Sequence, residues 1–273
     1  MGGINAAYYT DPASPGSWAR EPALRRLAVE LGDRLVVQPV MSGLAREFGP
    51  PLEQVSAWLE AAEESGMPVD PRLWMASPPA SSYPACMAVK AAAEQGAAVE
   101  AAFLRRLREG LAYGRRKLDT ADALVAEARG VPGCDVDRFA VDLGSHAVVE
   151  AFGADLERAG AVADDARDPS TGRARIPTLE LRGEEGRVGV VQGRFSYDEL
   201  RAAAERAGAA FDADAGHPGV EEALRRFGTL ATAEVAAVCD LPGPRAAAEL
   251  WRLAGEWRVR ADRQLTGELW SVA

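Results

Sequence analysis

Apolar and polar residues alternate along this chain in runs that predict strands separated by amphipathic helices. The run from Gly3 to Thr10 predicts a first strand, and apolar positions between Ser14 and Leu31 recur at helical spacing. The β-branched run from Arg34 to Val40 predicts a second strand that stops at Pro39, and Pro51 to Ser65 predicts another helix. The chain therefore begins with the strand–helix–strand–helix pattern of an α/β fold.

The middle of the chain is helical almost throughout, and strands return only late. Met67 to Pro84 is rich in proline and serine and predicts an ordered loop. Two apolar runs, Arg175–Arg182 and Arg187–Gln192, flank a glycine-rich turn and predict a hairpin. Ser196 opens the next helix with a capping box. We therefore predict an α/β domain that is interrupted by a large helical insertion, at about residues 51–165.

The last part of the chain predicts a separate small module of three helices and two short strands, an order typical of a winged helix. These elements are expected at Val220–Phe227, Thr232–Val238, Pro244–Leu253, Trp257–Arg260 and Gly267–Val272. The boundaries are residues 1–212 for the first domain and 217–273 for the winged-helix-like module. From Glu221 onward the module has seven arginines against eight acidic residues, so it lacks the basic face that DNA binding needs.

The composition excludes several classes of function. The net charge of −10 at pH 7 argues against an extended nucleic-acid interface. Three separated cysteines, Cys86, Cys134 and Cys239, form no CxxC pair and no zinc spacing, so we expect no disulfide framework and no metal. No apolar run is long enough to cross a bilayer, and the N-terminus has no leader pattern, so we expect a cytoplasmic protein. The arginines are expected mostly on solvated helix faces, and Glu21 in an ordinary surface pair.

The corner between the first strand and the first helix carries the most informative residues. Asp11-Pro12 ends the strand, and Ser14-Pro15-Gly16-Ser17 opens the helix. Serine is a favoured N-cap and proline fits the first helical position, so a structural cap accounts for these residues. A ligand-contacting role is compatible with the cap, because a helix N-terminus also attracts anions. Both interpretations stay open at this point.

Three separated stretches resemble DsbA-like proteins of the FrnE type. Tyr8–Pro22 resembles their first strand and active-site helix, and Ile176-Pro177-Thr178 matches the loop that holds their cis-proline. Ser81–Cys86, followed by Lys90, resembles the start of their helical insertion. The resemblance covers essentially the whole chain. It implies a thioredoxin-like fold in which Pro177 is cis and lies beside the Ser14 corner.

The chain departs from this family at the residues that carry its chemistry. FrnE-type proteins have Cys-Pro-x-Cys where this chain has Ser14 and Ser17, and a hydroxyl cannot cycle through a disulfide. The Ser-Pro-x-Ser corner is similar to that of kappa-class glutathione transferases and 2-hydroxychromene-2-carboxylate isomerases, whose first serine binds the sulfur of glutathione. The similarity implies glutathione or another low-molecular-weight thiol as cofactor. Its binding residues would be Ser14, Ser17, Pro177 and Thr178.

Other residues are candidates for the remaining roles in thiol chemistry. The nucleophile could instead be Cys86, whose pKa would be lowered at a helix start if it were partly exposed, although the sequence favours a buried apolar role for it. His146 is the candidate imidazole for proton transfer, against a structural role. The candidate walls of a substrate pocket are Asp11, Trp18 and Tyr83.

Two classes of function remain. The leading hypothesis is a cis–trans isomerase or thiol transferase that acts on a small-molecule or carrier-bound unsaturated substrate, because a thiolate can add to a conjugated double bond, allow rotation and leave. The alternative is a redox-inactive binding or adaptor protein, whose insertion and winged module present the surface. A DNA-binding regulator is disfavoured by charge, and a homodimer is left open.

Overall fold

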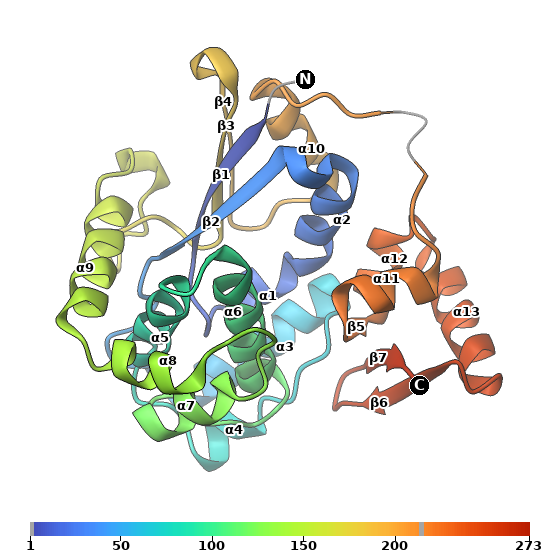
Figure 1. Cartoon of the computed structure of the whole chain (residues 1–273), viewed down its shortest axis with the longest axis horizontal. Coiled ribbons are helices and arrows are strands. Elements are labelled where there is room, and N and C mark those ends of the chain that lie inside the picture. The colour runs from blue at the N-terminus through green and yellow to red at the C-terminus, as the bar shows by residue number, and fades with distance from the viewer. Residues whose placement is uncertain (1–2, 213–215) are drawn as a thin grey trace.

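Four strands form the central sheet in the order β2-β1-β3-β4, with β1 parallel to β2 and the other pairs antiparallel (Figure 1). The computed structural model describes residues 3–212 and 216–273. The strands are β1 Ile4–Thr10, β2 Leu35–Met41, β3 Thr178–Arg182 and β4 Val188–Gln192. β2 continues through Pro39, where a stop was predicted. Because β2 lies at the edge of the sheet, the donor that proline lacks is not needed there.

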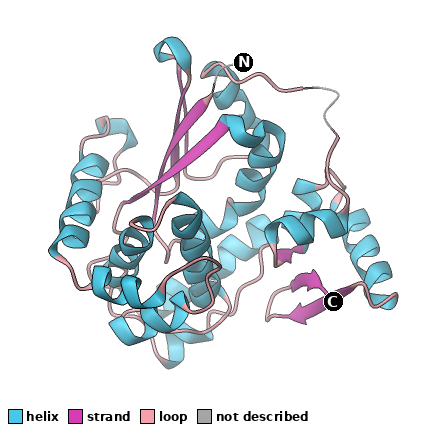
Figure 2. Ribbon diagram, in the orientation of Figure 1, coloured by secondary structure: helices cyan, strands magenta, loops and turns pink. Residues whose placement is uncertain are grey.

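Helices cover both faces of the sheet (Figure 2). On one face, α2 (Glu21–Leu31) and α10 (Tyr197–Arg206) bury Leu27 and Leu200 against β1 and β3. The packing of α10 on β4 is so close that a Cβ at Gly189 would overlap the backbone of Ala203. On the other face, α9 (His146–Gly160) packs against β2.

The first predicted helix is divided in two. α1 covers Pro15–Ala19, α2 begins at Glu21, and Arg20 lies between them with φ −95° and ψ −3°. Pro22 stands in the first turn of α2, where proline fits because the first N–H groups of a helix have no partner. The break therefore comes from a second helix start that apolar spacing did not predict.

The helical insertion consists of α3 to α9, and it holds most of the large buried side chains. Its helices before α9 are α3 Pro51–Ser65, α4 Arg72–Ala76, α5 Tyr83–Ala93, α6 Ala97–Ala112, α7 Ala121–Ala128 and α8 Val136–Leu143. α4 lies inside the segment that was predicted as a loop, and it buries Leu73 and Trp74. Short 3₁₀ turns lie at Gly32–Arg34, Asp164–Ala166 and Glu184–Gly186.

The C-terminal part has the predicted order of three helices and a hairpin, and adds one short strand. Its elements are α11 Val220–Phe227, β5 Leu230–Ala231, α12 Thr232–Val238, α13 Gly243–Gly255, β6 Val259–Arg263 and β7 Glu268–Val272, with the sheet order β5-β7-β6. Figure 1 shows this module beside α2 and α3, with the hairpin below α11. No helix in the described part of the chain is long and apolar enough to span a bilayer.

A buried ion cluster joins the sheet domain, the insertion and the C-terminal module. Glu21 on α2 binds the guanidinium groups of Arg105 and Arg108 on α6. Arg105 also binds Glu234 on α12, at 2.7 Å, and Arg25 binds the same carboxylate at 2.6 Å. Glu21 is only 7% exposed and Arg108 only 3%. The expectation of a surface pair for Glu21 and of solvated arginines is therefore wrong at these positions.

Candidate functional site

Ser14 caps α1, as the sequence predicted. Its backbone is extended, its Oγ accepts a hydrogen bond from the Ser17 N–H at 3.1 Å, and Pro15 takes the first helical position. The Ser17 hydroxyl is fully buried and accepts from Thr10 Oγ1 at 2.8 Å. Thr10 accepts in turn from Arg108 at 2.5 Å, which connects the corner to the ion cluster.

Pro177 lies directly against the corner. The Ile176–Pro177 peptide bond is cis, as the resemblance implied. A Cβ at Gly16 would lie 3.1 Å from Cδ of Pro177, so glycine allows the loop and the helix start to touch. The Thr178 side chain turns away from this contact, because its hydroxyl is buried and donates to the Arg175 carbonyl at 2.6 Å.

A pocket of about 280 Å³ opens beside the corner. Its wall opposite Ser14 and Pro177 is one side of α3, and two carboxylates there pair with two arginines: Glu64 with Arg20, and both Glu60 and Glu64 with Arg194. The lining residues are Ser14, Pro15, Gly16, Ala19, Arg20, Leu44, Ala57, Glu60, Ala61, Glu64, Ile176, Pro177, Gly193 and Arg194. Sequence reasoning missed this charged wall. The i, i+4 spacing of Glu60 and Glu64 on a predicted helix was the one available signal.

Asp11 is a fully buried acceptor rather than a pocket wall. Its Oδ1 accepts from the Ala13 N–H at 2.8 Å, and its Oδ2 accepts from the Leu44 N–H and the Ser82 hydroxyl at 2.6 and 2.7 Å. Burial raises the pKa of Asp11, because it outweighs these hydrogen bonds. Asp11 thereby ties the corner to the loop after β2 and to α5.

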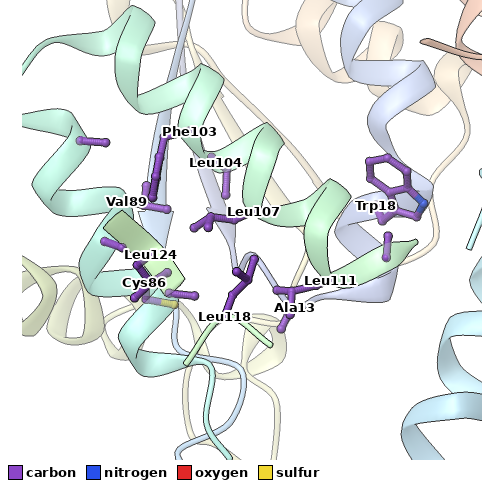
Figure 3. Close-up of a cluster of buried hydrophobic side chains, with 14 of the residues drawn as sticks. Ala13, Trp18, Cys86, Val89, Phe103, Leu104, Leu107, Leu111, Leu118 and Leu124 are labelled. Atoms are coloured by element: carbon purple, nitrogen blue, oxygen red, sulfur yellow. The ribbon is translucent and has the colours of Figure 1, made fainter. Parts of the chain in front are cut away.

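Cys86 is fully buried on α5, and its thiol donates to Oδ2 of Asp11 at 3.2 Å. Figure 3 shows its sulfur among apolar side chains, including Val89, Leu118 and Leu124. Burial, followed by the neighbouring Asp11 carboxyl, raises the pKa of the Cys86 thiol well above its ordinary value. The condition for a reactive thiolate, partial exposure, is not met.

The other candidate residues also lie outside the pocket. Trp18 is fully buried, and its indole N–H donates to the Pro68 carbonyl at 3.0 Å. Tyr83 packs edge-on against Phe152, with 5.1 Å between ring centroids. His146 is exposed at the start of α9 and does not line the pocket. Of the nine predicted site residues, the structure brings only Ser14 and Pro177 to the pocket.

The corner offers few backbone donors to an incoming sulfur. Pro15 has no N–H, the Ser17 N–H donates to Ser14 Oγ, and the Trp18 N–H donates to the Ser14 carbonyl. In this first turn the Gly16 N–H is left, together with the hydroxyl proton of Ser14. In the described part of the chain, no cluster of three histidine, cysteine or acidic side chains could hold a metal ion.

Comparison with known proteins identifies the family. A family model described as Thioredoxin matches residues 8–163, more than half of the chain, so the chain belongs to this thioredoxin family. The ClpXP adapter protein SpxH of Shouchella clausii is 28% identical over 96% of this chain and 86% of its own length. The SpxH of Halalkalibacterium halodurans is 31% identical over 55% of this chain, and that match spans about half (52%) of its length.

Solved structures agree with the fold. The cytosolic disulfide reductase DsbM of Pseudomonas aeruginosa is 19% identical, with a TM-score of 0.54 over 75% of this chain and 94% of that one. A 2-hydroxychromene-2-carboxylate isomerase is 21% identical, with a TM-score of 0.50 over 75% of this chain and 94% of that one. The predicted thioredoxin-like α/β fold is thus confirmed, and at these identities the likeness concerns the fold only.

Proposed function

We propose that this chain is a thioredoxin-fold binding protein that acts as an adapter for ClpXP, and that it carries out no thiol chemistry of its own. In this role it binds a client protein and brings it to ClpXP. The relatives named ClpXP adapter support this proposal, because one of them aligns with 96% of the chain, the C-terminal module included. This outcome reverses the order of the two sequence hypotheses.

The observation that carries the proposal is the state of the corner. Serines occupy both positions at which FrnE-type proteins have cysteines. The nearby thiol, of Cys86, is buried and donates a hydrogen bond to Asp11, and the Ser17 hydroxyl is also buried. A thiolate needs several donors or a cation to lower its pKa. The arginines near the pocket, Arg20 and Arg194, are already paired with Glu64. The corner therefore keeps the scaffold of the family and lacks the groups that activate sulfur.

The ion cluster supports the same function. It holds the sheet domain, α6 and α12 together through charges that are almost completely removed from water. Removing one partner from such a cluster is strongly destabilising, so these parts are expected to move together. A rigid surface that spans two modules suits the recognition of a folded client, because the chain loses less conformational entropy when it binds.

Reconstitution tests the adapter function. The client is first identified by cross-linking to the chain in cells of the source organism, and its processing by purified ClpXP is then followed with and without the chain. We expect the chain to raise the rate several-fold, and both Ser14→Ala and Cys86→Ala to leave that increase intact. An unchanged rate with wild-type chain contradicts the proposal.

A second function, thiol-dependent isomerisation, is favoured by one observation: the pocket has room beside Ser14 and Pro177. Titration of the labelled chain with reduced glutathione distinguishes the two. The adapter proposal expects no shift of the Gly16 and Gly193 amide resonances at millimolar thiol. Saturable shifts there, with turnover of a conjugated cis-diene that Ser14→Ala abolishes, would establish the isomerase instead.

A further inference from the structure

The C-terminal module has an exposed aromatic residue in an unusual position. Trp257 follows α13, is 87% exposed, and has a left-handed φ of 58°. Its N–H donates to the Ala254 carbonyl and the next N–H, of Arg258, donates to Leu253, which is the hydrogen-bond pattern of a Schellman helix end. Glycine is preferred at this position because a β-carbon is strained there. The fold alone gives no reason for a tryptophan at this place.

Trp257 stands at the beginning of an unpaired strand edge. β6 is the outer strand of the sheet β5-β7-β6. The Ala273 N–H donates to the Arg258 carbonyl, and the Gln264 N–H donates to Gly267, so even-numbered residues of β6 face β7. Because peptide groups in an antiparallel strand alternate in direction, those of Val259, Ala261 and Arg263 point to the free edge. Within the described chain, no backbone hydrogen bond joins them to another segment.

The charge around this edge has the opposite sign from the charge of the whole chain. Between Arg245 and Arg263 there are five arginines and three acidic residues, whereas the chain carries −10. Arg260 is exposed on β6 and makes no ion pair within the described residues. Arg263 is exposed, and its nearest carboxylate, Glu268, is 3.7 Å away. Arg260 is therefore available to a negatively charged partner, and Arg263, whose pair with Glu268 is long, adds positive charge nearby.

We propose that the free edge of β6, together with Trp257, binds an extended acidic segment of a partner protein by strand addition. The segment's backbone would pair with the outward peptide groups, acidic side chains on one of its faces would meet Arg260, and the indole would cover an apolar residue. Trp251 and Trp257 are the only aromatic side chains among the large exposed apolar residues of the described chain. The inference rests on the proposed function in one respect, since it names the surface by which the adapter holds its client.

A random peptide library displayed on phage is the probe, and it is selected against the purified full chain. We expect enriched peptides to be acidic and to alternate β-branched with polar residues. A synthetic copy of the best peptide should lose affinity by about tenfold or more on Trp257→Gly, as for an aromatic anchor at an interface. Glycine also relieves the left-handed backbone, so this variant should be at least as heat-stable as the wild type.

Two further variants separate charge from strand pairing. Arg260→Glu should weaken binding of the peptide, whereas Arg226→Glu, the same charge change on α11, should leave the binding unchanged. Ala261→Pro removes an outward N–H and keeps the ladder to β7, so it should abolish binding without unfolding the module. If Ala261→Pro proves unstable, Arg263→Pro repeats the test at an exposed side chain.

Several outcomes overturn the inference: equal binding by Arg260→Glu and Arg226→Glu, full affinity for Trp257→Gly, or no effect of proline at the edge. A wild-type dimer that Ala261→Pro dissociates would assign the edge to a second copy of this chain, and retention on duplex DNA lost with Arg260→Glu would assign it to nucleic acid. If the edge binds the peptide but the chain has no effect on ClpXP processing, the binding surface stands and the adapter function is refuted. If the chain stimulates processing and these variants do not change that stimulation, only the proposed role of the β6 edge is refuted.

Discussion

Two buried carboxylates on either side of the Ser14 corner behave in opposite ways. Asp11 accepts from two N–H groups, a hydroxyl and a thiol, it makes no ion pair with the described residues, and burial raises its pKa. Glu21 is nearly as buried, but Arg108 and Arg105 outweigh the effect of burial and lower its pKa. Burial alone therefore does not determine the direction in which the pKa of a carboxyl group shifts. The direction depends on whether cations from another helix reach the group.

The largest expected effect is at the Glu21 site. Arg108→Met removes the guanidinium that binds Glu21 and Thr10. The buried Glu21 carboxylate then has fewer cations to balance its charge. We expect the free energy of unfolding to fall by about 3–5 kcal/mol. Urea denaturation measures it. Arg225→Met, which breaks an exposed pair with Glu221, is the matched control and should cost about 0–1 kcal/mol. Equal losses for the two variants would show that the cluster is not effectively buried.

Removal of Asp11 should have a smaller effect, because no charge is left unpaired. Asp11→Ala deprives the Leu44 and Ala13 N–H groups of their acceptor, whereas the Ser82 hydroxyl keeps the Ala45 carbonyl at 3.2 Å. Unsatisfied buried donors of this kind cost about 1–3 kcal/mol, which urea denaturation would detect. Asp11→Asn keeps one carbonyl oxygen, so its free energy of unfolding should lie between those of Asp11→Ala and the wild type. A loss as large as that of Arg108→Met would remove the distinction between the two sites.

Ser14 lies between Asp11 and Glu21 in the sequence, and its substitution should have a modest effect on stability. Ser14→Ala removes the acceptor of the Ser17 N–H at the start of α1. We expect about 1 kcal/mol of lost stability, the usual effect of an N-cap, measured by thermal unfolding. Ser14→Asp restores an N-cap acceptor and should recover most of it. If Ser14→Ala loses the ClpXP stimulation while its fold is intact, the corner is part of the client site.

The pH dependence of stability should differ in sign between the two sites. Asp11 has a folded pKa above its ordinary 3.8, so its contribution is fully present below 3.8 and is lost as pH rises through the folded pKa. Glu21 has a folded pKa below 4.5, so its contribution is present above 4.5 and is lost as pH falls through the folded pKa. Stability differences from Asp11→Asn and Glu21→Gln, measured between pH 3 and 7, should therefore slope in opposite directions. Slopes of the same sign would contradict the assignment.

The local pattern predicted much of the fold. The strand at the N-terminus, the late hairpin, the cap at Ser14 and the order of elements in the C-terminal module all follow from short-range spacing and turn residues. Short-range rules failed where a second signal intervened. Pro22 started a new helix inside a continuous apolar pattern, and α4 formed in a segment whose prolines predicted a loop.

The candidate site was less predictable, because its walls come from distant segments. Pro177 was located through a family resemblance, and Glu60 and Glu64 reach the pocket from the insertion. Cys86 was a candidate nucleophile and Asp11 a candidate pocket wall, and the structure instead joins them to each other inside the core. Spacing along the chain carries no information on which side of a packed helix faces a pocket.

By itself, the sequence determined an α/β fold through its local spacing, and its resemblance to DsbA-like proteins implied the thioredoxin-like type. The identity of Ser14 and Ser17 alone determined that the corner cannot perform dithiol chemistry. The tertiary structure decided the direction in which the pKa of Asp11 and that of Glu21 shift, the burial of Cys86 and the exposure of Trp257. These properties depend on how much water and which cations surround a group after segments far apart in the chain have packed together. For the same reason, the Ser14 corner is packed into the fold, whereas the outer edge of β6 remains open to a partner.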